Sequence, residues 1–132
     1  MSREDRSIGW GAVMLVAGGA ILLIATGVFP SPRNPANAPW FVLALAGIVF
    51  AAGGAALMLP PGSRVRLAMV AVLVAGFAVA GAWAAATGSA DTITGGLFFL
   101  SRETNALLGR IVFGFGSAVS AVILVVIFRQ LQ

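Results

Sequence analysis

Strongly apolar stretches alternate with short polar breaks along this chain of 132 residues. Four of the stretches are long, and they cover residues 8–29, 39–59, 67–86 and 107–128. Each has close to the ~20 residues that a helix needs to cross ~30 Å of hydrocarbon. Because backbone polar groups in lipid must hydrogen-bond to one another, apolar runs of this length form helices there. The pattern therefore predicts an all-α integral membrane protein with four transmembrane helices.

Proline and glycine mark the breaks between these stretches. Prolines interrupt residues 29–35, and Pro39 stands at the start of the second stretch, where its missing N–H costs nothing. Residues 59–64, LPPGSR, form a tight turn of the kind that joins antiparallel helices. The third break, residues 87–104, is longer and less regular. Since no long hydrophilic segment separates the stretches, we expect one membrane domain over residues 1–132, a four-helix bundle with short loops.

The amino-acid composition also favours lipid as the solvent of this chain. Hydrophobic residues make up 60% of it and charged residues only 9%, and the mean hydropathy is +1.04. Soluble domains average about 25% charged residues. A domain this small leaves a large fraction of its surface exposed, so a soluble fold has no place to hide so much apolar area.

The basic residues are all arginines, and they bear on topology. There are 8 of them, with a formal net charge of +4. They stand singly or in pairs at the edges of apolar stretches, which is typical of topology determinants and not of nucleic-acid binding. Four spans put both termini on one side with the turn at 60–66, and that side carries most of the arginines: Arg3, Arg6, Arg64, Arg66 and Arg129. Positive charge favours the cytoplasm, which predicts a multi-pass bacterial inner-membrane protein with both termini cytoplasmic.

The residue types needed for most catalytic chemistry are missing. The chain has no cysteine and no histidine, which excludes disulfides, thiolate ligands and the usual axial ligand of haem. The first three apolar stretches contain no Asp, Glu, Arg, Asn or Gln, although ionisable residues inside a membrane are the default functional candidates. We therefore expect no enzyme, no cofactor and no metal site.

The charged residues near the fourth stretch form the candidate contact site for a partner or a lipid. These residues are Asp91, Arg102, Glu103 and Arg110. Ser101 is a suitable N-cap for a helix that places Glu103 in its first turn, where the helix dipole favours an anion. Glu103 and Arg110 are seven residues apart and so share a helix face. Either Arg110 extends toward the headgroups, or it binds an acidic lipid, a carboxylate substrate or an acidic residue of a partner.

Small residues at four-residue spacing predict where the helices pack. In lipid, helix pairing relies on close contact between small side chains. The second stretch carries Gly47, Ala51 and Ala55, and the third carries Gly76, Ala80 and Ala84. Because a short turn joins these two stretches, we expect the two stripes to face each other. Gly114 and Ala118 make the fourth stretch smooth as well, either for packing inside the bundle or as a docking face.

Two segments carry a resemblance to known proteins. They are Glu103-Thr104 with Gly109-Arg110-Ile111-Val112-Phe113-Gly114, and Ala38-Pro39-Trp40 with Ala46-Gly47-Ile48-Val49-Phe50. In these segments, about a fifth of the chain, the sequence resembles small uncharacterised four-helix bacterial inner-membrane proteins, and that resemblance implies no activity. In span number and length the chain is also similar to the small membrane subunits of tripartite carboxylate transporters.

Two classes of function remain open from the sequence. The first is a non-catalytic accessory subunit that docks through Gly/Ala-rich helix faces onto a larger respiratory, photosynthetic or transport complex. Its partners are membrane lipids and other integral membrane subunits. The alternative is a small membrane subunit of a solute transporter, or a self-assembling transporter or pore. That alternative needs polar residues along a pathway, and only the region from Asp91 to Arg110 offers them.

Overall fold

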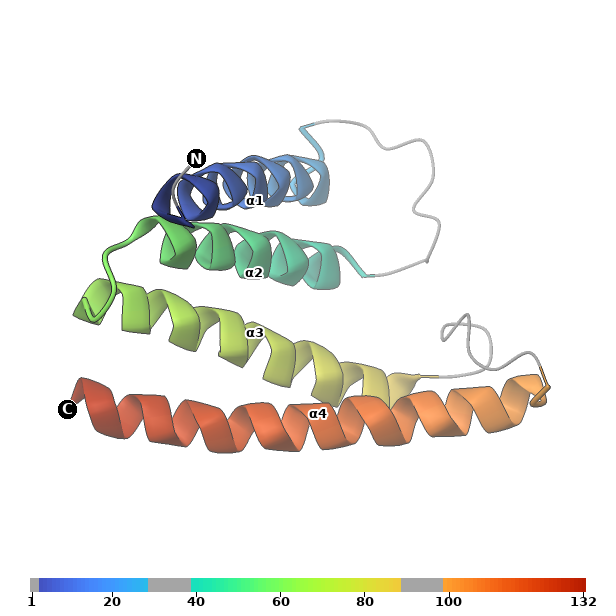
Figure 1. Ribbon diagram of the computed structural model, residues 1–132. Helices are drawn as coiled ribbons and strands as arrows, with labels where there is room; N and C mark the ends of the chain where they lie inside the picture. The colour runs from blue at the N-terminus through green and yellow to red at the C-terminus, as the bar shows by residue number, and fades with distance from the viewer. Residues whose placement is uncertain (1–2, 29–38, 89–98) are drawn as a thin grey trace.

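The protein is built from four helices. A computed structural model describes residues 3–28, 39–88 and 99–132. It contains α1 (Arg3–Ala25), α2 (Trp40–Met58), α3 (Arg64–Thr87) and α4 (Arg102–Leu131) (Figure 1). Each of the four is long and apolar enough to cross a membrane. The predicted all-α fold with four helices is therefore confirmed.

The helix α1 ends at Ala25, four residues before the end of the apolar stretch at residue 29. Gly27 adopts a left-handed conformation with φ 76°. Its N–H donates to the Ile24 carbonyl at 3.1 Å. The next N–H, of Val28, donates to the Leu23 carbonyl at 3.1 Å. This pair of bonds is a Schellman motif, which ends a helix even though the apolar run continues beyond it.

The helices α3 and α4 begin before their apolar stretches, because a serine caps each of them. The Ser63 hydroxyl accepts a hydrogen bond from the Arg66 N–H at 3.1 Å. The Ser101 hydroxyl accepts one from the Thr104 N–H at 3.2 Å, which confirms the predicted cap. With its polar first turn, α4 reaches 30 residues, or about 45 Å, and exceeds the ~30 Å of a hydrocarbon core.

The helices lie side by side in chain order, as an open row. Contacts join α1 to α2, α2 to α3 and α3 to α4 (Figure 1). In the described part of the chain, no other two helices bring their Cα atoms within 8 Å of each other. Both chain ends and the α2–α3 turn lie at one end of the row, which we call the termini-bearing end. Consequently α1 and α4 are edge helices, and the predicted bundle is open.

Glycines bring α1 and α2 into backbone contact. A Cβ atom added to Gly18 would lie 2.7 Å from the Gly47 carbonyl oxygen. A Cβ atom added to Gly54 would lie 2.6 Å from the carbonyl oxygen of Gly11. Each helix therefore presents two glycines seven residues apart, in antiparallel register, and all four are buried. No other residue type fits at this distance, so the sequence determines which sides of α1 and α2 meet.

The expected pairing of the two small-residue stripes is wrong. Gly47 lies against α1, and the backbone of Ala51 is also close to Gly18 of α1. Gly76 of α3 instead meets the side chain of Val49 on α2. The stripe of α2 faces α1 because the α1 glycines allow a closer approach than α3 does. The remaining members, Ala55, Ala80 and Ala84, are half-buried.

The row leaves many large apolar side chains exposed. The buried hydrophobic residues are few and mostly alanines: Ala52, Ala56, Ala71, Ala106 and Ile127. Of the four spans, α2 is the most enclosed and α4 the least. The buried surface consists mainly of helix backbone and small side chains, so the packing depends on short distances and not on large apolar residues.

Replacing Gly18 with leucine tests the α1–α2 contact. The Gly18→Leu side chain would collide with the backbone of α2, so we expect the free energy of unfolding to fall by at least ~2 kcal/mol. The matched control is Gly19→Leu, because nothing lies within 4 Å of a Cβ added there. That variant should change stability by no more than ~1 kcal/mol, through helix propensity. Thermal unfolding in one detergent, followed by circular dichroism, measures both, and equal stabilities would contradict the contact.

Candidate functional site

The α3–α4 pair is held by polar contacts between side chains and backbone. The Ser117 hydroxyl of α4 donates a hydrogen bond to the Ala78 carbonyl of α3 at 2.6 Å. Close by, a Cβ atom added to Gly81 would lie 2.9 Å from the Phe113 carbonyl oxygen. A glycine on α3 thus permits the approach, and a serine on α4 uses it for a hydrogen bond.

Arg110 has a partner within the chain. Its Nε–H donates to the Ala85 carbonyl of α3 at 2.7 Å. Ala85 lies in the last turn of α3, where carbonyl groups lack partners inside the helix and carry the negative end of its dipole. The guanidinium therefore neutralises the end of α3 and ties it to α4. Arg110 and Ala85 are each seven residues from the Ser117–Ala78 contact, so both bonds follow one antiparallel register.

The other charged residues predicted for this site are not gathered around Arg110. Arg102 and Glu103 are exposed, and Glu103 lies in the first turn of α4 as predicted. Two helical turns, about 10 Å along the axis, separate Glu103 from Arg110. The Nε atom of Arg110 points to α3. Asp91 lies outside the described residues. Within the described part of the chain, the structure therefore unites Arg110 with α3 and not with the predicted acidic residues.

The two small residues predicted on α4 point in different directions. A Cβ atom added to Gly114 would meet the Ala85 side chain at 3.5 Å, an ordinary packing distance. Ala118, by contrast, is exposed. Only Gly114 therefore lies in the α3–α4 contact, while Ala118 belongs to the outer surface of α4.

Aromatic rings connect α2 and α3 at the end of the row that also holds Arg110. Phe41 and Trp83 pack edge to face, with ring centroids 5.9 Å apart. Trp40 adds a second edge-to-face contact with Phe41 at 6.5 Å, and it is otherwise exposed. Tryptophans at helix ends are typical of the boundary between lipid and water.

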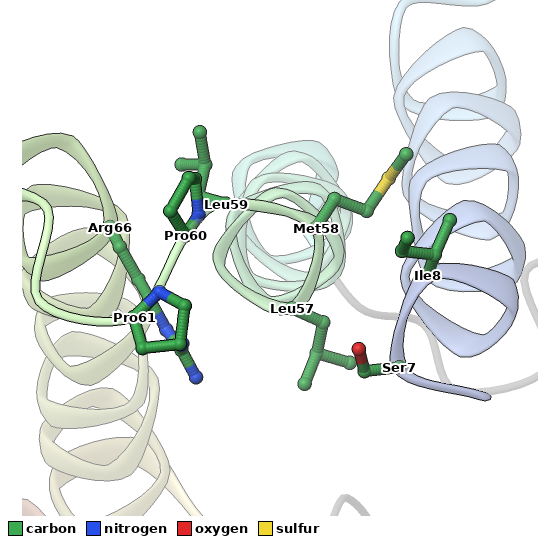
Figure 2. A pocket seen from close by; sticks show the side chains of 8 residues that line it. All are labelled: Ser7, Ile8, Leu57, Met58, Leu59, Pro60, Pro61 and Arg66. Carbon is green, nitrogen blue, oxygen red and sulfur yellow. The ribbon is translucent and has the colours of Figure 1, made fainter. Parts of the chain in front are cut away.

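A second candidate site lies at the termini-bearing end and centres on Arg66. A hollow of about 470 Å³ lies there. Figure 2 shows the side chains that line it, with Ser7 of α1 on one side, Pro61 and Arg66 on the other, and Leu57 between them. Two further hollows of about 310 and 410 Å³ adjoin this region. Arg66 lines all three. Arg66 is thus a wall that the three hollows at this end share.

The second hollow is an apolar groove along the middle of the row. The side-chain ends of Met14 and Leu73 cover Gly53 of α2, where an added Cβ atom would lie 3.0 Å from Met14 Cε and 3.0 Å from Leu73 Cδ1. Met14 belongs to α1 and Leu73 to α3, so these two helices flank α2 as walls. In the described part of the chain the Cα atoms of α1 and α3 stay more than 8 Å apart, and the ends of these two side chains form the floor of the groove. We call the larger hollow and this groove the Arg66 site.

The Arg66 site was not predicted, because Arg64 and Arg66 were given the same role as topology determinants. The signal was present in the helical period. Two side chains that are two positions apart on a helix point about 200° away from each other. Only one of Arg64 and Arg66 can therefore point toward α2. In the structure Arg64 is exposed and Arg66 is half-buried.

Comparison of the chain with protein-family models, with curated proteins and with solved structures finds no match. In the described part of the chain, no group of three or more His, Cys, Asp or Glu residues is placed to hold a metal ion. The row and its two polar contact regions are the basis for a functional proposal.

Replacing Arg110 measures what its hydrogen bond contributes. Arg110→Gln removes the charge-assisted bond to the end of α3, and we expect a loss of about 1–2 kcal/mol in the free energy of unfolding, because the site is exposed. Arg102→Gln is the matched control, since this arginine is exposed in the first turn of the same helix. Its effect should stay within about 0.5 kcal/mol. Identical unfolding curves for the two variants would show that the Arg110 bond contributes no stability.

Proposed function

We propose that the protein is a non-catalytic, multi-pass subunit of the bacterial inner membrane that docks onto a larger membrane complex. Both termini lie in the cytoplasm, and the outer side of α1 is the docking side. The lengths of the helices support the membrane placement, and the distribution of small residues on α1 supports the docking.

The charged residues of α3 and α4 fit the thickness of a membrane. Arg110 and Arg129 of α4 are nineteen residues apart, which is about 28 Å along the helix axis at 1.5 Å per residue. This length is close to the thickness of the hydrocarbon core. The same number of residues separates Arg66 from Ala85, the partner of Arg110. Both helices therefore match one slab. The termini-bearing end carries the majority of the arginines, which supports its cytoplasmic location.

A second set of small residues on α1 carries the docking proposal. Gly11 and Gly18 already pack against α2. The side of α1 away from α2, its outer side, presents small residues beside the exposed Val13 and Val16; the small residues are Gly9, Ala12, Gly19 and Ala20. The two glycines have nothing within 4 Å of an added Cβ atom, and the two alanines are exposed. Since small residues let membrane helices approach closely, this side suits a partner helix.

The other edge of the row has fewer small residues among its bulky side chains. Pointing away from α3, α4 presents bulky apolar side chains, all of them exposed: Phe115, Val119, Val122 and Val126. Such a surface contacts lipid chains well but keeps another backbone at a distance. The contrast between the two edges favours α1 as the docking edge.

Bulky substitutions on the outer side of α1 test this function. We expect the Ala12→Leu/Ala20→Leu variant to unfold at the wild-type temperature, because neither side chain packs inside the row. Its recovery with the partner complex, extracted from native membranes in mild detergent at equal expression, should fall at least tenfold. The control Ala118→Leu changes an exposed alanine on α4 and should retain the complex.

Two results would contradict the docking role. One is purification of the wild-type protein without a stoichiometric partner, as an oligomer of itself that transports a solute in vesicles. The other is full recovery of the complex with the Ala12→Leu/Ala20→Leu variant, which would show that the outer side of α1 faces lipid.

A further inference from the structure

The termini-bearing end has an excess of positive charge. Three segments bring arginines there: the start of α1, the start of α3 and the end of α4. In the sequence, two acidic residues, Glu4 and Asp5, stand beside the arginines at the start of α1. An anion at this end is therefore favoured by the electrostatic field of several guanidinium groups.

Arg66 is an arginine at this end that lines a hollow. It belongs to the first turn of α3, and its stem forms a wall beside Pro61 (Figure 2). The hollow of about 470 Å³ is within the usual size range of small-ligand sites. Its walls mix the polar Ser7 and Arg66 with apolar side chains such as Ile8 and Leu57. The hollow therefore combines a cation with apolar surface.

The apolar groove continues from this hollow toward the middle of the row. Leu57 and Arg66 line both. From Arg66 the groove extends along α3 to Leu73, seven residues or about 10 Å farther from the termini-bearing end. Apart from Arg66, the side chains that line it are apolar. A cationic mouth with an apolar extension has the shape and polarity of a lipid that carries a negative headgroup.

We propose that the Arg66 site binds an anionic phospholipid of the cytoplasmic leaflet, such as phosphatidylglycerol. The phosphate lies in the larger hollow beside the Arg66 guanidinium, whose planar donors match phosphate oxygens. One acyl chain lies in the groove, over the ends of the Met14 and Leu73 side chains. This inference rests on the membrane placement proposed above, but not on docking to a larger complex.

A tryptophan beside the site provides the probe. Ser7, Trp10 and Met14 follow each other at spacings of three and four residues, so Trp10 lies on the side of α1 that borders the hollow and the groove. The chain has 3 tryptophans, and replacement of Trp40 and Trp83 by phenylalanine leaves Trp10 alone. This variant is reconstituted in bilayers of phosphatidylcholine and phosphatidylglycerol, with bromine on one of the two lipids in each sample. Quenching of the Trp10 fluorescence then measures how often the brominated lipid lies close to Trp10.

At equal mole fraction, we expect brominated phosphatidylglycerol to occupy the site about fivefold more often than brominated phosphatidylcholine, as one arginine near an anionic headgroup permits. Arg66→Gln should reduce this preference to near one. Arg64→Gln is the matched control, with the same loss of charge two residues away on an exposed side chain. It should retain most of the preference, and Arg66→Lys should retain part of it.

Three outcomes would overturn the proposal. Equal quenching by the two lipids in the wild-type protein would exclude a specific site. An equal loss of preference with Arg64→Gln and Arg66→Gln would assign it to the diffuse charge of this end. Absence of quenching by either lipid would refute the membrane placement and the lipid site with it. The docking role is judged separately, by co-purification.

Discussion

The backbone contact between α1 and α2 is the constraint on which the rest of the row depends. Between apolar helices in lipid there is little hydrophobic gain from association, so stability comes from distance and polar contacts. Gly11 and Gly18 of α1 meet Gly54 and Gly47 of α2 at distances that exclude any side chain. This contact fixes the rotation of both helices. It directs the remaining small residues of α1 outward and leaves the other side of α2 for α3.

The second helix pair, α3 and α4, uses a different chemistry. Ser117 and Arg110 of α4 each donate a hydrogen bond to a carbonyl of α3. Both bonds lie in the same antiparallel register, so they fix how far α4 slides along α3. The row thus consists of a glycine-packed hairpin and a hydrogen-bonded hairpin. The contact between α2 and α3 joins the two hairpins in a single layer. The groove that ends at Arg66 lies on one side of this layer.

Helix number, the bounds of α2 and the end of α3 could be predicted from the sequence, because apolar run length acts locally, and so could the serine cap of α4. The end of α1 could not, since the apolar run hides the turn at Gly27. The partner of Gly47 was also missed, because spacing within one helix does not identify which neighbour comes closest. Arg110 and Arg66 show the same limit. A charge at the edge of a span can bind a carbonyl of the next helix or line a hollow, and only the packing of the helices distinguishes these roles.

The open row is the central claim, and the distance between its edge helices tests it most directly. The chain has no cysteine, so spin labels attached to Val16→Cys on α1 and Val119→Cys on α4 are the only labels in the protein. In the observed registers these positions lie at the same level. Three helix spacings of about 8–10 Å predict a separation of at least ~25 Å by electron double resonance in bilayers. A distribution centred below ~20 Å, within two spacings, would indicate a closed bundle and contradict the open row.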